Sequence, residues 1–230
     1  MVDWGQRTQG AEYLDEAGAS GEDLEQALVE LAWINRMLGG VKATLSIFGQ
    51  LALGKRVEIL DLGTGAADIP VALVKWGRAR GVEVRVVAVD FNPAVCAWVQ
   101  RQTAAYPQIE IRQADVFSLD LPPGSFDFVH CALFLHHFPQ AAAAQLLQRF
   151  YTWSRRGLIV NDLHRHPGAF YPVKWGTGLW SRSRMVQHDG PLSVLRGFSR
   201  GEVEELARLS EVPLSLKWHW AFRWVMTAFK

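Results

Sequence analysis

Short apolar runs alternate with longer amphipathic stretches through the middle of the chain. The apolar runs predict five strands, and the stretches between them show helical spacing of apolar residues. A run as rich in β-branched residues as Val84 to Val89 is typical of a parallel strand buried on both faces. Strands that alternate with helices predict a parallel sheet with right-handed crossovers. The predicted strands are Val57 to Leu62, Val84 to Val89, Ile109 to Gln113, Phe126 to Leu133 and Gly157 to Asn161.

The pattern differs on either side of this alternating region. Before it, helical spacing from Leu24 to Ile34, with Ser20 as the expected N-cap, predicts one helix, and Val41 to Leu51 predicts another. After it, residues 163–198 combine prolines and glycines with many aromatic side chains, which predicts an irregular or partly helical insertion. A capped helix from Ser199 and two final strands complete the predicted order.

Composition narrows the class of protein. The hydrophobic fraction of 49% and charged fraction of 20% are typical of a soluble globular protein, and 230 residues fit one domain. A net charge of +1 gives no reason to expect a nucleic-acid partner or an anionic membrane. No apolar run is long enough to predict a signal peptide or transmembrane segment, so we expect a cytoplasmic location. Cys96 and Cys131 are far apart and predict neither a disulfide framework nor a zinc knuckle.

A glycine-rich turn follows the first predicted strand. Gly63 and Gly65 allow a tight turn and let a ligand approach the backbone, while the next helix points its first amides at that ligand. Asp68 stands where the NAD fingerprint would place glycine or alanine, and its charge disfavours a pyrophosphate. S-adenosylmethionine (SAM) has no phosphate, and its cationic groups suit the acidic residue Asp61 at the end of the strand.

On these residues the chain resembles the class I SAM-dependent methyltransferases, especially the UbiE-like group that acts on quinones and other small lipophilic molecules. The first family motif is an acidic residue followed by x-Gly-x-Gly-x-Gly. The chain matches it at Asp61, Gly63 and Gly65 and departs from it at Ala67. The resemblance implies a Rossmann-like, seven-stranded, mostly parallel sheet with helices on both faces. One antiparallel strand is then expected near the C-terminus, in the pair formed by residues 214–229.

The resemblance also implies how SAM is held. Asp90, which ends the second strand, would accept hydrogen bonds from the ribose hydroxyls, and Phe91 would pack on the adenine. Asp115, followed by Val116, would accept from the adenine amino group. The run that ends at His130 resembles the fourth-strand motif, which places this histidine in the expected SAM site.

Methyl transfer from a sulfonium is an in-line displacement, and a hydroxyl acceptor must lose a proton. Histidine is the usual base near neutral pH. His136 and His137 belong to a Leu-His-His stretch that resembles a family motif, and His188 lies in the aromatic insertion, where Asp189-Gly190 predicts a turn. These three histidines are the catalytic candidates.

A metal site is the alternative for the histidines. Several of them fall near the carboxyl ends of the predicted strands, where open α/β sheets bind ligands: His130, His136, His137, His164 and His166. No metal-binding spacing stands out, and the chemistry of the resembled family needs no metal. We therefore expect no metal ligands.

The resulting hypothesis is methyl transfer from SAM to a small lipophilic, aromatic acceptor, with O-methylation before C-methylation. Two alternatives stay open: an NAD(P)-binding oxidoreductase and a SAM-binding module without catalysis. We expect a single domain with a helical lid in residues 1–50, a SAM-binding core in 55–163 and a substrate lid in 163–198. A C-terminal helix and strand pair, 199–230, would complete it. Both lids are expected to become ordered with ligand.

Overall fold

A seven-stranded sheet forms the centre of the computed structural model, which describes residues 2–16 and 18–230. The strand order is β3-β2-β1-β4-β5-β7-β6. The first five strands are parallel, whereas β7 runs antiparallel to both β5 and β6, as predicted. The strands are β1 (Arg56–Leu62), β2 (Glu83–Asp90), β3 (Ile109–Gln113), β4 (Phe126–Ala132), β5 (Ser154–Leu163), β6 (Ser215–His219) and β7 (Arg223–Phe229).

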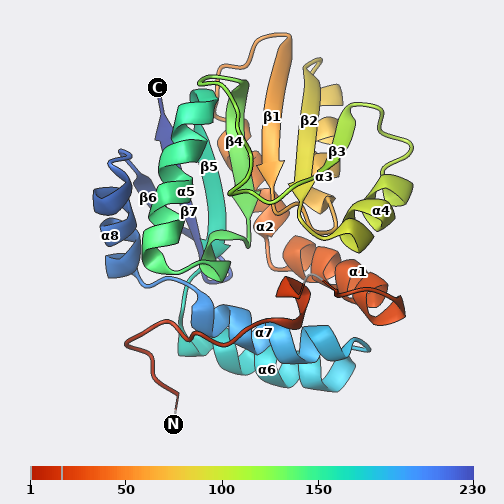
Figure 1. Ribbon diagram of the computed structural model, residues 1–230, viewed down its shortest axis with the longest axis vertical. Helices are drawn as coiled ribbons and strands as arrows, with labels where there is room; N and C mark the ends of the chain where they lie inside the picture. Colours follow the sequence, from red (N-terminus) through yellow and green to blue (C-terminus); the bar gives the residue numbers. More distant parts are fainter. Residues whose placement is uncertain (1, 17) are drawn as a thin grey trace.

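Helices cover both faces of the sheet (Figure 1). On one face α5 (Gln140–Trp153) and α8 (Arg200–Ser210) pack on a core of leucine, valine and aromatic side chains. On the other, α2 (Gly40–Phe48) and α3 (Asp68–Arg78) enclose a second core with β1 and β2. The helix α4 (Pro93–Gln102) connects β2 to β3. None of the helices in the described part of the chain is long and apolar enough to span a bilayer.

A further layer of helices lies beyond the carboxyl ends of the parallel strands (Figure 1). It contains α1 (Glu22–Met37), α6 (Pro167–Trp180) and α7 (Arg184–Arg196), with α7 in contact with both of the others. The N-terminal segment crosses α7, where Thr8 N donates to Leu195 O and a short 3-10 helix (Tyr13–Asp15) packs on α7. The strands therefore end beneath this layer. We call it the roof; it consists of the N-terminal segment, α1, α6 and α7.

The insertion between β5 and α8 is more regular than its proline content predicts. Pro172 lies inside α6 and Pro191 inside α7, although proline removes a backbone donor and crowds the preceding turn. Close packing of the two helices on each other outweighs that cost. The predicted turn at Asp189-Gly190 is wrong, because both residues lie inside α7.

Helix starts were predicted with mixed success. Asn92 caps α4, accepting from Ala94 N and Val95 N, and Ser199 forms the predicted capping box with Glu202. The Ser20 cap is wrong: the N-cap of α1 is Gly21, with φ of 85° and no side-chain cap bond. Glycine reaches this left-handed backbone conformation without strain, so the chain enters α1 one residue later than expected.

Candidate functional site

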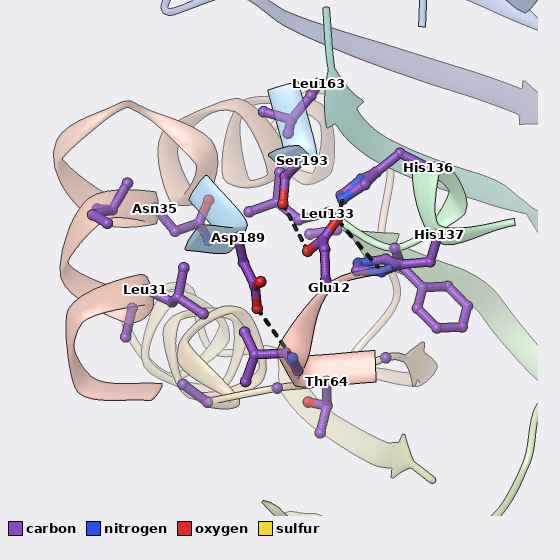
Figure 2. Close-up of a pocket in the computed structure, with 18 of the residues that line it drawn as sticks. Glu12, Leu31, Asn35, Thr64, Leu133, His136, His137, Leu163, Asp189 and Ser193 are labelled. Atoms are coloured by element: carbon purple, nitrogen blue, oxygen red, sulfur yellow. Dashed lines mark hydrogen bonds and ion pairs between the residues drawn. The ribbon is translucent and has the colours of Figure 1, made fainter. Parts of the chain in front are cut away.

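A large cavity lies between the carboxyl ends of the strands and the roof helices (Figure 2). Its volume is about 1010 Å³, and most of its lining is apolar. One end is formed by the glycine-rich turn after β1 and the ends of β2 and β3; the other is enclosed by α1, α6, α7 and the N-terminal segment. Cavities of this position and size bind small organic ligands.

The glycine-rich turn opens into this cavity. Gly63 has φ of 63°, and a Cβ there would overlap the ring of Phe134, so both backbone and packing favour glycine. Gly65 has φ of 48°, and nothing lies within 4 Å of a Cβ built on it, which leaves its backbone open to a ligand. Its amide donates to Asp90 Oδ2 at 3.1 Å, which ties the turn to the end of β2. The hydroxyl of Thr64 is buried and has no hydrogen-bond partner among residues 2–16 and 18–230.

His130 does not reach the cavity, contrary to the expected SAM contact. It is fully buried behind Asp61, with its Nδ1 at 2.5 Å from Asp61 Oδ1 and its Nε2 at 3.2 Å from Thr44 Oγ1. Asp61 itself lines the cavity. The histidine therefore orients the carboxylate that faces the ligand, in the way an outer partner fixes a site residue.

Two further carboxylates make this wall of the cavity strongly acidic. Burial raises the pKa of both Asp68 and Asp90. Asn35 donates to Asp68 Oδ2 at 2.7 Å, and the amide of Asn92 donates to Asp90 Oδ1 at 3.1 Å, but neither contact supplies a cation. A ligand with positive charge would stabilise the ionised forms, whereas a pyrophosphate would be repelled.

The remaining predicted SAM residues divide into two groups. Phe91, Asp115 and Val116 line the cavity, and Asp115 Oδ1 accepts from Phe117 N at 2.9 Å. Ala67 does not line it; its side chain is fully buried beside Leu24 of α1. Alanine at this position, where the motif has glycine, thus serves helix packing. The φ of Ala67, 54°, still suits a turn.

A polar cluster lies at the other end of the cavity (Figure 2). Glu12 Oε1 is 3.7 Å from His136 Nε2 and 3.9 Å from His137 Nδ1, and its Oε2 accepts from Ser193 Oγ at 2.8 Å. His137 Nδ1 is 2.6 Å from Asp15 Oδ1. Arg196 joins the two acidic side chains, at 3.4 Å from Glu12 Oε1 and 2.7 Å from Asp15 Oδ2. The short 3-10 helix Leu135–His137 holds both histidines at the end of β4.

The two adjacent histidines have different surroundings. His136 is buried, and its Nδ1 lies 2.6 Å from Asp162 Oδ1. Burial alone would lower the pKa of His136, but Asp162 and Glu12 outweigh it and raise that pKa to about 9. Burial correspondingly opposes ionisation of Asp162, but His136 dominates and lowers the pKa of this carboxyl. The side chain of His137 is 19% exposed and borders the cavity. His136 is therefore a fixed cation at neutral pH, and His137 is the accessible imidazole.

The same three side chains are the candidate metal ligands. Suitable atoms of Glu12, His136 and His137 lie within 4.8 Å of one another. The two imidazole rings are tilted, with centroids 4.2 Å apart and an interplanar angle of 31°. Each ring already has a carboxylate beside its Nδ1, Asp162 at 2.6 Å from His136 and Asp15 at 2.6 Å from His137. Arg196 already balances the Glu12 charge. The arrangement therefore suits proton handling better than metal binding.

His188 lies outside this cluster. Its ring stacks on Tyr13 at a centroid distance of 4.1 Å, and it is not among the residues that line the cavity. Its neighbour Asp189 does line the cavity but is occupied by the amides of Tyr13 and Leu14 and by His188 Nδ1. The geometry thus favours His137 over His188 as the base.

The acidic half of the polar cluster was not predicted from the sequence. Glu12 and Asp15 come from an N-terminal segment with no helical or strand periodicity, so no local pattern marked them. Arg196 was missed for a similar reason, because it lies in the insertion, which was predicted only as irregular or partly helical, without the bounds of α7. The one available signal was chemical: two adjacent histidines at a strand end need acidic partners from elsewhere if they are buried.

Comparison with known proteins relates part of the chain to methyltransferases by sequence, and the whole fold to them by structure. Residues 59–157 match the family described as "Methyltransferase domain". No curated protein matches the chain by sequence. A SAM-dependent methyltransferase from Aquifex aeolicus superposes with a TM-score of 0.63 at 15% identity, covering 91% of this chain and 99% of that one.

A second similar structure was crystallised with the methyl donor. Magnesium protoporphyrin IX methyltransferase of Synechocystis with bound SAM has a TM-score of 0.55 at 14% identity, covering 93% of this chain and 86% of that one. The same enzyme with bound S-adenosylhomocysteine (SAH) gives 0.56 at 16% identity, with coverage of 93% and 90%. The matched residues 59–157 contain the glycine-rich turn and the ends of the first four strands. Residues 59–157 thus match a methyltransferase domain, and the fold of the chain is the one that SAM-dependent methyltransferases of known structure have.

Proposed function

We propose that this protein transfers the methyl group of SAM to a hydroxyl of a small, lipophilic, aromatic acceptor. The observation that carries the proposal is one continuous cavity with an acidic wall at one end and an apolar chamber with a histidine cluster at the other. Its volume of about 1010 Å³ is at the upper end for a ligand site, which leaves room for two molecules.

The acidic wall suits the donor. Asp61 and the open backbone at Gly65 would hold the amino-acid part of SAM, and the buried Thr64 hydroxyl offers an unused polar partner. Asp90 would accept from the ribose hydroxyls, and Phe91, Asp115 and Val116 would surround the adenine. SAM supplies an already activated methyl group, so the protein's contribution is orientation and exclusion of water.

The chamber suits a flat, apolar acceptor. Side chains of α1 and α6 form facing walls, with aromatic rings at their ends and few polar atoms between them. Pro172 and Gly176 line the cavity with little side-chain volume, so an aromatic ring could lie flat against α6. The wall residues are Leu31, Trp33, Ile34, Met37, Leu38, Pro172, Val173, Gly176 and Trp180. An uncharged phenol or quinol fits these apolar walls without the desolvation cost that burying a charged group there would carry.

The polar cluster suits removal of the acceptor proton. His137 is the base, and Asp15 is a positioning residue that holds its Nδ1 so that the other ring nitrogen is free. Burial would raise the pKa of Asp15, but His137 and Arg196 outweigh it and lower the pKa to about 2, so this carboxylate stays ionised. The positive charge on His136 would stabilise a developing phenolate. A hydroxyl nucleophile benefits from all three features, which favours O-methylation over C-methylation.

The test is a methyl-transfer assay with isotopically labelled SAM and a panel of simple phenols and hydroquinones. We expect label in an ether product that resists mild base. Stoichiometric SAM binding with no transfer to any acceptor would instead support a binding module without catalysis. Transfer to carbon rather than oxygen, read by mass spectrometry of the product, would contradict the assigned chemistry. A chelator should leave the rate unchanged.

A further inference from the structure

Large hydrophobic side chains are exposed on α6. Tyr171, Trp175 and Leu179 follow one another at intervals of four residues, so they share one side of the helix. Their exposed fractions are 41%, 64% and 89%. Leu179 is thus almost fully in solvent, and the adjacent Trp180 is also exposed. Figure 1 shows α6 at the outer edge of the roof layer, away from the sheet. A stripe of this kind on an outermost element marks an interaction surface.

The stripe borders the opening of the cavity. Trp33, Met37, Trp180 and Trp220 both line the cavity and are exposed, which places them at its mouth. The Trp33 and Trp180 rings lie 5.0 Å apart, so α1 and α6 meet there. Ala221 N donates to Leu38 O, which brings the β6–β7 turn and Trp220 to the end of α1. The exposed apolar surface is therefore continuous with the proposed acceptor chamber.

The charges around this mouth have one sign. The segments that form and adjoin it, residues 31–48, 163–188 and 212–223, contain no aspartate or glutamate, although the chain has 23 acidic residues. Exposed basic side chains lie in all three: Arg36, Lys42, Lys174, Arg182 and Lys217. Within residues 2–16 and 18–230 none of these five forms an ion pair. A net charge of +1 conceals this segregation.

We propose that this mouth, formed by α6, the C-terminal half of α1 and the β6–β7 turn, docks on an anionic lipid surface from which the acceptor enters the cavity. Tryptophan and tyrosine favour the boundary between headgroups and acyl chains, and unpaired lysine and arginine attract anionic headgroups. An apolar acceptor would then pass from the bilayer into the chamber without crossing water. This inference rests on the proposed lipophilic acceptor, but its binding step needs no methyl transfer.

Vesicle sedimentation tests the docking directly. The full-length protein is mixed with vesicles of phosphatidylcholine alone or of phosphatidylcholine and phosphatidylglycerol in equal parts. We expect the wild type to bind the anionic vesicles and to be released by salt. In the double variant Trp175→Ser/Leu179→Ser, binding should fall by roughly tenfold, because the stripe can no longer enter the interface. In Lys174→Glu/Arg182→Glu it should fall by at least about fivefold for each basic side chain changed.

Matched controls lie far from the mouth. Leu209→Ser changes an exposed leucine on α8, and Lys55→Glu reverses a charge beside the amino end of β1, so both should bind vesicles like the wild type. Trp175 and Lys174 do not line the cavity, so the mouth variants should keep wild-type transfer to a water-soluble phenol. Their transfer to a long-chain alkylphenol dissolved in anionic vesicles should fall in parallel with binding.

Three results would overturn the inference: no binding of the wild type to anionic vesicles, equal loss in mouth and control variants, or a wild-type dimer that Trp175→Ser/Leu179→Ser dissociates. The last, read by sedimentation velocity, would assign the surface to a second copy of the chain. If the wild type binds vesicles but methylates no phenol, the docking stands and the proposed function fails.

Discussion

At the scale of single residues, His136 and His137 divide the work of one site. Both line the cavity, but His136 is buried between Asp162 and Glu12 as a cation, whereas His137 is partly exposed and pairs with Asp15 through one ring nitrogen. In the proposed reaction, these neighbouring residues of one short helix supply a fixed charge and a base. Only the second of these roles requires proton transfer, so the two should respond differently to substitution.

For His137→Gln we expect a fall in kcat of about 10²- to 10⁴-fold with little change in SAM affinity, because general base catalysis contributes on that order. Steady-state kinetics with a phenol acceptor and calorimetry with SAM measure the two quantities. Asp15→Asn should lower kcat less and shift the pH profile, since the base remains but loses its partner. His188→Gln is the control; a large loss of kcat there, with His137→Gln active, would return the base to α7.

The charge on His136 predicts a pH dependence of stability. The pKa of a free histidine is about 6.5, and the folded protein raises that of His136 to about 9. The stabilising contribution is therefore fully present below pH 6.5 and is lost as the pH rises through about 9, amounting to about 3 kcal/mol. Urea unfolding across this range should show a decline that is absent in His136→Gln. Parallel curves for both proteins would contradict the charged His136–Asp162 pair.

Asp90 is the residue that best tests the proposed SAM site. Removing an acceptor for the ribose hydroxyls costs about 1–3 kcal/mol, so Asp90→Ala should weaken SAM binding by about ten- to a hundredfold. The amide of Gly65 also loses its partner, which acts in the same direction. Calorimetry measures the affinity, and Glu110→Ala on the neighbouring strand β3 is a control at an exposed position. Unchanged affinity in folded Asp90→Ala would place the ribose elsewhere.

At the scale of elements, the strands were predictable and the roof was not. The second half of β2 is buried or half-buried on both faces, and its β-branched composition marked the strand. Pro172 and Pro191 are local helix breakers, and only the mutual packing of α6 and α7, invisible in the sequence, keeps both segments helical. The acidic wall, which is the donor wall of the proposed function, could be predicted because its residues lie at strand ends. The polar cluster could not, because Glu12 meets His136 from far away in the chain.

The N-terminal segment acts as a strap whose position depends on Arg7. Its guanidinium donates to His136 O at 2.6 Å, to Phe138 O at 3.0 Å and to Arg196 O at 2.7 Å. Arg7→Ala should release the strap and displace Glu12 and Asp15, which lowers kcat/KM for the acceptor by roughly tenfold or more. SAM affinity should stay within twofold, roughly, because the donor wall lies elsewhere.

Hydrogen exchange checks the structural cause of that effect. Amides of residues 8–16 should exchange faster in Arg7→Ala, while those of β1 and β2 should be unchanged. Lys42→Ala, an exposed change on α2, is the control. Lower acceptor kcat/KM without faster exchange in the strap would mean that Arg7 acts on the substrate directly rather than through the segment.

At the scale of the whole molecule, the cavity separates the sheet from the roof, so the two parts meet across ligand-sized space. A ligand that binds only the folded state stabilises it by about 2.7 kcal/mol at a concentration of 100 times Kd. For a chain of 230 residues that should raise Tm by about 5–10 °C. SAH at this concentration should give this shift, and Asp90→Ala should lose about half of it or more at the same concentration. An apolar phenol added to the SAH complex should raise Tm further, because it fills the chamber between α1 and α6. NADH should give no shift, since Asp68 and Asp90 oppose a pyrophosphate; a shift with NADH and none with SAH would reverse the assignment of the donor wall.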